Sequence, residues 1–118
     1  MTLSDHQAAF LLDACNLIQK ATELGFKVTG GELSRTAEQQ EIYVKTGRSE
    51  TMLSNHLKRC AIDLNFFKDG KLVYDQKSLQ PVGDYWESLC PNNSWGGNWT
   101  APGGKKPFKD LPHFERRP

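Results

Sequence analysis

The segment from residue 60 to residue 74 constrains the fold most strongly, because its side-chain character alternates every two residues. One face of the predicted strand carries the apolar residues Ile62, Leu64 and Phe66. The opposite face carries Ala61, Asp63, Asn65 and Phe67. The following Asp69-Gly70 pair is typical of a tight hairpin turn, and it leads into a second strand over 72–74. The sequence therefore predicts an antiparallel hairpin in the middle of the chain.

Helices are predicted around this hairpin. Ser4 and Gln7 have the spacing of a capping box, which predicts a helix over 5–24, before Gly25. A second box at 36–39 predicts a helix to about residue 45, and a third helix is expected over 78–90, with Pro81 in its first turn. The inward residues of this third helix are predicted to be Tyr85, Trp86 and Leu89.

Short strands complete the predicted sheet. Residues 26–29 form one, and residues 91–118 are expected to be mostly loop with a final short strand. Because no strand–helix–strand alternation is present, the expected fold class is α+β: a small antiparallel sheet with a central hairpin, flanked by about three helices.

Length and charge limit the possible classes. A chain of 118 residues is expected to form a single domain over 1–118. A net charge of +1 does not favour nucleic acid or an anionic membrane as the main partner. We expect no stable membrane insertion, since no apolar run approaches the roughly 18 residues that span a bilayer. Residues 1–5 lack the pattern of a signal peptide. Three unpaired-looking cysteines predict buried, reduced thiols, and His6 is expected to be a surface residue.

Three residues far apart in the sequence are chemically suited to bind one metal ion. Asp63 lies on the face of the strand opposite its apolar residues, His56 precedes it by seven positions, and His113 lies between Pro112 and Phe114 near the C-terminus. Two imidazoles and one carboxylate form a sensible ligand set for catalytic zinc, which leaves a fourth position open. Taken singly, either histidine is more often a structural or surface residue, and Asp63 alone fits a carboxylate bonded to backbone amides.

Several ordered motifs together resemble a known family. Ser54-x-His56-x6-Asp63, followed by Asp110-x-x-His113, is similar to the D-alanyl-D-alanine peptidase family, and particularly to its phage L-alanyl-D-glutamate endolysins. Further matching segments are 34–39, 81–87, 95–99 and 112–115. The resemblance implies the fold shared by hedgehog domains and D-Ala-D-Ala peptidases. It departs from the family at Cys60, where many relatives carry glycine, and no additional wall-binding module is expected.

The resemblance also implies roles for individual residues. His56, Asp63 and His113 would be the Zn²⁺ ligands, and Asp110 would be the general base and acid. Arg35 would hold the substrate carbonyl or its developing oxyanion, because a guanidinium keeps its positive charge. The alternatives are a turn aspartate for Asp110 and a salt bridge to a nearby carboxylate for Arg35. Ser54 is a candidate for substrate contact.

The implied function is hydrolysis of the L-Ala–D-Glu bond in peptidoglycan, in a phage endolysin that acts as a monomer. Such an enzyme would stay in the host cytoplasm until a holin releases it to the periplasm and cell wall. Two alternatives stay open: a D-Ala-D-Ala carboxypeptidase or dipeptidase, and a zinc-containing binding domain without turnover. A nuclease is disfavoured, since no basic stripe with interleaved aromatics accompanies the predicted site. Trp95 and Trp99 fit either the wall of a cleft or packing under a loop.

Overall fold

The computed structural model describes residues 1–31, 58–99 and 109–118. The predicted helix at 36–45 and the candidates Arg35, Ser54 and His56 lie outside these residues. Within them the chain is α+β, as the sequence predicts, with two α-helices and one five-stranded antiparallel sheet.

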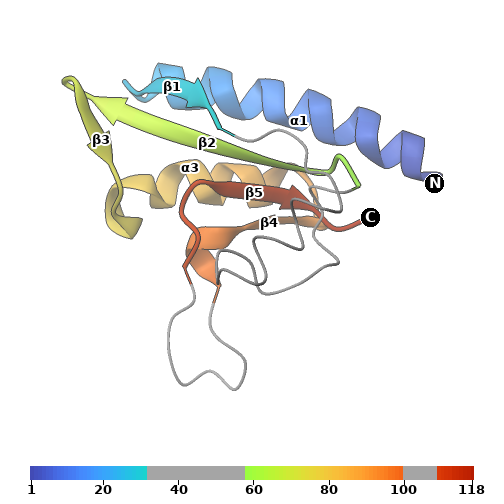
Figure 1. Cartoon of the computed structure of the whole chain (residues 1–118). Coiled ribbons are helices and arrows are strands. Elements are labelled where there is room, and N and C mark those ends of the chain that lie inside the picture. The colour runs from blue at the N-terminus through green and yellow to red at the C-terminus, as the bar shows by residue number, and fades with distance from the viewer. Residues whose placement is uncertain (32–57, 100–108) are drawn as a thin grey trace.

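Strand β2 (Ala61–Lys68) organises the sheet, because it pairs with three other strands. Its second half pairs with β1 (Lys27–Gly30) and with β3 (Lys71–Val73), and its first half pairs with β5 (His113–Arg116). β5 pairs in turn with β4 (Asn93–Trp95), so the strand order is β1-β2-β5-β4 (Figure 1). The C-terminal strand is therefore inserted between two strands that precede it in sequence.

The hairpin between β2 and β3 confirms the central prediction. Asp69 and Gly70 both have positive φ angles, 54° and 76°, as a two-residue type I′ turn requires. Ile62, Leu64 and Phe66 are all buried, whereas Asp63 is only partly buried. The period-two pattern thus placed Ile62, Leu64 and Phe66 on the core face of this strand, as predicted.

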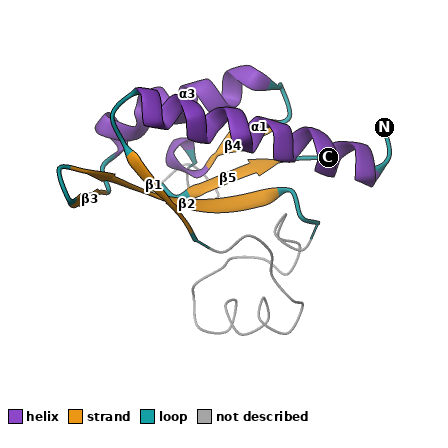
Figure 2. Ribbon diagram, turned by 90° about the horizontal axis from the view of Figure 1, so that it is seen from above, coloured by secondary structure: helices purple, strands orange, loops and turns teal. Residues whose placement is uncertain are grey.

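Helices α1 (Leu3–Glu23) and α3 (Gln76–Leu89) cover one face of the sheet (Figure 2). The main core lies between these helices and the sheet. Phe114 of β5 is at its centre, with ring centroids 6.0 Å from Trp86 of α3 and 5.8 Å from Phe66 of β2. Trp86 also packs edge-on against Phe10 of α1. The prediction that Trp86 is a core residue is confirmed, while Tyr85 and Leu89 are partly buried beside the core.

Both described helices begin earlier than predicted. The capping box of α1 is formed by Thr2 and Asp5, so the assignment of Ser4 and Gln7 is wrong. Asp75 caps α3 by accepting a hydrogen bond from the backbone N–H of Ser78. Pro81 consequently lies in the second turn of α3 rather than in the first. In each helix the threonine or aspartate whose side chain accepts from a backbone N–H of the first turn sets the start.

The described residues of the C-terminal segment, 91–99 and 109–118, contain more regular structure than predicted. Its final strand, β5, is confirmed, but β4 and the 3₁₀-helix η1 (Gly96–Asn98) were missed. Trp95 of β4 is fully buried, and its indole N–H donates to the carbonyl oxygen of Leu111 at 2.9 Å. A Cβ at Gly83 of α3 would overlap this indole ring, so the glycine allows β4 to approach the helix closely. Trp95 is therefore a core residue.

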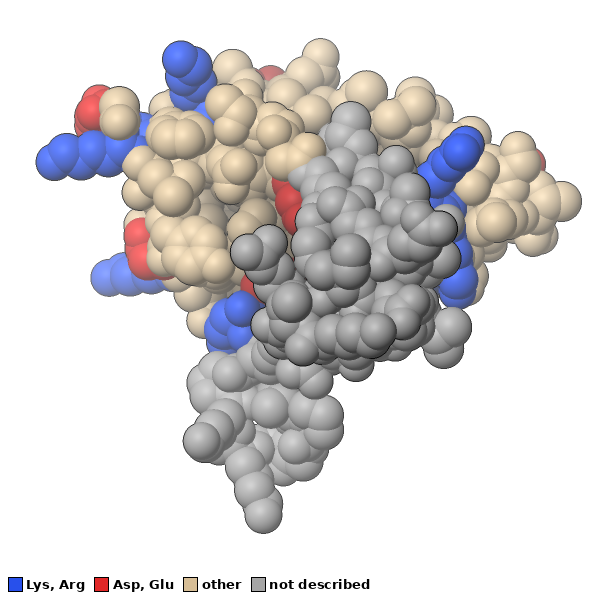
Figure 3. All heavy atoms as spheres, in the orientation of Figure 1, with Lys and Arg blue, Asp and Glu red and all other residues tan. Residues whose placement is uncertain are grey.

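Three further findings concern the described residues. No helix among them is long and apolar enough to cross a membrane. On the face shown in Figure 3, lysine and arginine side chains of the described residues lie apart near the edges, not in one stripe. The cysteines are free, as predicted, but Cys60 is buried, Cys90 is partly buried and Cys15 is exposed, so the prediction that they are buried is wrong for Cys15.

Candidate metal centre

Asp63 and His113 are brought together by the pairing of β2 with β5. They are directly opposed in the antiparallel register, although 50 positions separate them in the chain. The Nδ1 atom of His113 lies 3.2 Å from the Oδ1 atom of Asp63. The side chain of His113 is 8% exposed and that of Asp63 is 26% exposed. Two of the three predicted metal ligands are thus adjacent, on rigid strands, and one of them still reaches solvent.

The face that carries this pair follows from strand alternation. Phe114 points into the core beneath the helices, so its neighbours His113 and Glu115 point to the other face of the sheet. Asp63 points to the same face, between the core residues Ile62 and Leu64. The backbone carbonyl of Asp63 accepts a hydrogen bond from the N–H of Gly31 at 2.7 Å, at the end of β1. The backbone of Asp63 is therefore fixed by Gly31 on one side and by pairing with β5 on the other.

Asp110 lies in the turn that leads into β5. Its carbonyl oxygen accepts a hydrogen bond from the backbone N–H of His113 at 3.1 Å, and its own N–H donates to the carbonyl oxygen of Gly96 at 3.0 Å. A Cβ at Gly96 would overlap the Asp110 carbonyl group, so only glycine allows this close approach. The turn places the backbone of Asp110 next to the backbone of His113, and the hydrogen bond to Gly96 connects this turn to η1.

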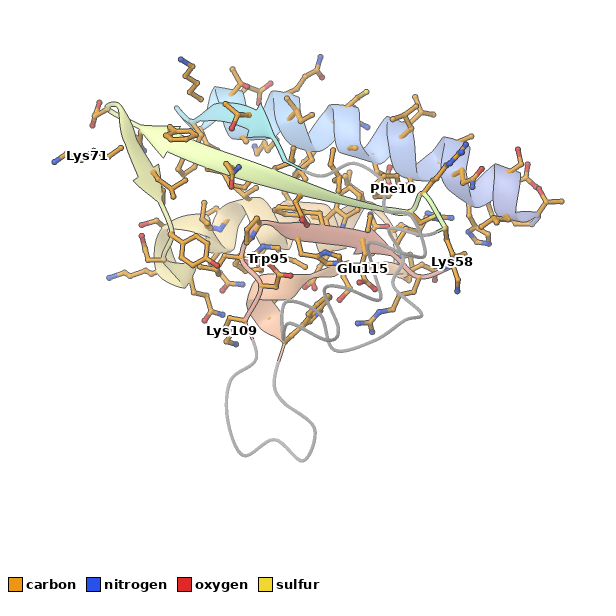
Figure 4. The ribbon with its side chains drawn as sticks, in the orientation of Figure 1. Phe10, Lys58, Lys71, Trp95, Lys109 and Glu115 are labelled. Carbon is orange, nitrogen blue, oxygen red and sulfur yellow. The ribbon has the colours of Figure 1, made fainter. Side chains whose placement is uncertain are left out.

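Two further residues contact the ring of His113: Glu115, to which the sequence analysis gave no role, and Trp99, which it left as either a cleft wall or packing under a loop. Glu115, on β5 itself, accepts through Oε1 at 2.8 Å from Nε2 of the imidazole, and its side chain is labelled in Figure 4. The ring of Trp99 lies on another side, with ring centroids 5.0 Å apart. The period of two from His113 to Glu115 in a predicted strand was a signal for the first contact. The contact between Trp99 and His113 agrees with the cleft-wall alternative for Trp99.

The charges around His113 shift the pKa values of both partners. Burial by itself would lower the pKa of His113, but hydrogen bonds to Asp63 and Glu115 outweigh it and raise this pKa from 6.5 to about 9. Burial would raise the pKa of Glu115, but its bonds with His113 and Arg117 outweigh burial and hold that pKa below its ordinary value. Without another cation, the imidazole is accordingly a protonated group between two carboxylates.

His56, Arg35 and Ser54 lie in the range 32–57, outside the described residues. Among the described residues, no group of three His, Cys, Asp or Glu side chains is arranged to hold a metal ion. The described part of the chain thus supplies two candidate ligands, Asp63 and His113, and the third predicted ligand is outside it.

Comparison with known proteins identifies the family. Residues 47–116 match the family model described as D-alanyl-D-alanine carboxypeptidase. The chain belongs to this family. The matched region includes Asp63, Asp110 and His113, and it also includes Ser54 and His56, whereas Arg35 lies before it. The prediction of a D-Ala-D-Ala peptidase relative is therefore confirmed, and the chain is a peptidase of the class that acts on peptidoglycan peptides.

A solved structure supports the same fold. The crystal structure of the L-Ala D-Glu endopeptidase ChiX from Serratia marcescens is similar to this chain, with a TM-score of 0.67 and 21% sequence identity. The similarity covers 97% of this chain and 85% of that one. No curated protein matches the sequence.

Proposed function

We propose that the protein is a zinc peptidase that hydrolyses stem peptides of peptidoglycan, with His56, Asp63 and His113 as the metal ligands. The observation that carries this proposal is the Asp63–His113 pair, a carboxylate and an imidazole opposed on adjacent strands within the region that matches the peptidase family.

The contact between the two side chains fits a bound cation. When His113 is neutral and its Nε2–H donates to Glu115, its Nδ1 atom presents a lone pair toward the Asp63 oxygen. Two acceptors 3.2 Å apart repel each other unless a proton or a metal ion lies between them. Nitrogen and oxygen ligands both suit zinc, and His56 would complete a set of three protein ligands with an open position.

Chemistry at this site would combine the metal with protein groups. Zinc, when bound, polarises a carbonyl group and lowers the pKa of a water molecule. Asp110 would accept the proton of the attacking water and pass it to the amine released when the peptide C–N bond breaks. Arg35 would stabilise the negative charge that develops on the carbonyl oxygen, and Ser54 would contact the substrate.

The bond we propose as substrate is L-Ala–D-Glu. The similarity to an L-Ala D-Glu endopeptidase over nearly the whole chain supports this choice. We further propose the role of a monomeric phage endolysin, a single domain over 1–118, released from the host cytoplasm by a holin. The sequence resemblance to phage endolysins supports this role.

A second candidate is a D-Ala-D-Ala carboxypeptidase. The description of the matching family favours it, since that description names this activity. Both candidates would use the same metal site and differ in the bond that is presented to it.

Digestion of purified peptidoglycan, followed by mass spectrometry of the muropeptides, distinguishes the two. New amino-terminal D-Glu supports the endopeptidase, whereas released D-Ala without new D-Glu termini contradicts it in favour of the carboxypeptidase. The Asp63→Asn variant is the control for metal-dependent cleavage. If the zinc-loaded wild-type protein binds peptidoglycan but releases neither product, it is a binding domain and the peptidase proposal fails.

A further inference from the structure

We propose that Glu115 is a positioning residue that fixes the orientation and tautomer of the His113 ring, so that Nδ1 faces Asp63 as the metal-binding nitrogen. This inference rests on the proposed zinc site. It concerns Glu115 and Arg117, which are not among the proposed metal ligands.

The first support is the geometry of the His113 ring. Its two nitrogens have different partners: Nε2 lies 2.8 Å from Glu115 Oε1, and Nδ1 lies 3.2 Å from Asp63 Oδ1. A neutral imidazole has one N–H, so it donates to only one of these carboxylates. The shorter contact is with the more buried carboxylate, since the side chain of Glu115 is 8% exposed and that of Asp63 is 26% exposed. Glu115 is therefore the stronger candidate for the N–H.

The second support is the way in which Glu115 is itself held. Its second oxygen, Oε2, accepts a hydrogen bond from Nε of Arg117 at 2.9 Å. Its backbone lies in a strand paired on both sides, opposite Ala61 of β2 and Ser94 of β4. Its carbonyl oxygen accepts from the buried indole N–H of Trp86 at 3.1 Å. The carboxylate therefore has little freedom to move away from the imidazole.

The third support is the packing around the ring. Trp99 lies 5.0 Å from the His113 ring, and its indole N–H donates to the hydroxyl oxygen of Ser94 at 2.8 Å. The guanidinium of Arg117 lies 5.8 Å from the centre of the same Trp99 ring. Arg117 thus contacts both the carboxylate and the indole that surround the imidazole, which restricts rotation of the His113 ring.

The chemical consequence concerns the metal-binding nitrogen. A histidine ligand whose other N–H donates to a carboxylate is fixed in one tautomer and is a more basic ligand. Without Glu115, the ring loses the acceptor that fixes its tautomer, and part of the binding energy of the metal is then spent on ordering it. Loss of such a partner weakens metal binding by roughly 10- to 100-fold.

The experiment measures zinc affinity and the protonation of the ring nitrogens. Zinc dissociation constants are obtained by competition with a chromophoric chelator for the wild-type protein, Glu115→Ala and Glu115→Gln. Long-range ¹H–¹⁵N spectra of the zinc-loaded wild type identify the nitrogen of His113 that carries the proton. We expect this proton on Nε2, zinc affinity reduced roughly 10- to 100-fold in Glu115→Ala, and partial rescue in Glu115→Gln, whose single amide oxygen accepts from Nε2–H but no longer leaves an acceptor for Arg117.

A control variant separates positioning from general loss of stability. Asp75→Ala removes the N-cap of α3 and leaves the contacts of His113 intact, so it should lower thermal stability without changing zinc affinity. If Glu115→Ala does not fold, Glu115→Gln tests the positioning role. The Nε2–H proton resonance should then move upfield, because the carboxylate that accepts this proton is replaced.

The outcomes are distinguishable from failure of the proposed function. Zinc affinity unchanged in Glu115→Ala, an unmoved Nε2–H resonance in Glu115→Gln, or zinc bound through Nε2 would each overturn the positioning role while leaving the zinc peptidase intact. A wild-type protein that binds no zinc would overturn both.

Discussion

At the scale of single residues, the environment of His113 determines most of what the site can do. Among the described residues, its ring contacts Glu115 of the same strand, Asp63 of β2, and the indole of Trp99, which follows η1. Residue type alone does not produce this arrangement. The register of β5 against β2 does.

Asp110 is the residue for which activity and metal binding should separate. We expect Asp110→Asn to reduce hydrolysis of peptidoglycan by about 10²- to 10⁴-fold, because an amide cannot accept the proton of the attacking water. Zinc content should be unchanged, since the proposed ligands are His56, Asp63 and His113. Turbidity assays of purified walls, together with elemental analysis of the same samples, measure both quantities. Lysis at the wild-type rate would remove Asp110 from the mechanism.

The raised pKa of His113 predicts a pH dependence for the metal-free protein. Because this pKa is 6.5 ordinarily and about 9 in the folded chain, the folded state binds the proton more tightly than the unfolded state does. The resulting stabilisation is fully present below about pH 6.5 and is lost as the pH rises through about 9. Denaturant unfolding in chelator, from about pH 6 to about pH 10, measures it.

The matched control for this pH series is His113→Gln, which cannot take up the proton. The difference between the two stability curves should shrink as the pH rises. A constant difference would show that the folded chain does not raise the pKa of His113.

At the scale of elements, close approach of α3 and β4 depends on Gly83. Alanine within a helix normally gains about 1 kcal/mol over glycine, but a Cβ at Gly83 would overlap the buried Trp95 ring. Overpacking of this kind typically costs about 1–3 kcal/mol, so we expect Gly83→Ala to be destabilising despite the gain in propensity. Thermal unfolding measures the effect.

Gly30→Ala is a suitable comparison, because a Cβ at that position meets no heavy atom within 4 Å. We expect it to change the melting temperature much less than Gly83→Ala does. Equal effects of the two substitutions would mean that loss of glycine, rather than contact with Trp95, accounts for the change.

At the scale of the whole molecule, a bound metal would connect segments that are far apart in sequence. Removal of zinc should lower the melting temperature of the wild-type protein, since a ligand that binds only the folded state stabilises it by about 2.7 kcal/mol at a concentration 100 times its dissociation constant. Calorimetry before and after dialysis against chelator tests this, and zinc added back should restore the transition. Asp63→Asn should show a much smaller response to zinc than the wild type.

The sequence by itself determined the local features. Period-two alternation placed Asp63 on one face of β2 and the core residues on the other, and the Asp69-Gly70 pair determined the turn, because both depend on neighbouring residues alone. The family motifs also predicted site roles for Asp63, Asp110 and His113, and these roles stay predictions. Helix starts were misplaced by two residues each, since several nearby polar residues were able to act as caps.

The tertiary structure alone decided which distant residues meet. Insertion of β5 between β2 and β4 opposes His113 to Asp63 and buries Glu115 against the same ring, and no local pattern specifies that insertion. β4 was missed for the same reason: a three-residue strand has little propensity signal of its own and is stabilised by pairing with β5 and by packing of Trp95 against α3. Contacts between residues far apart in the chain depend on how the whole core packs.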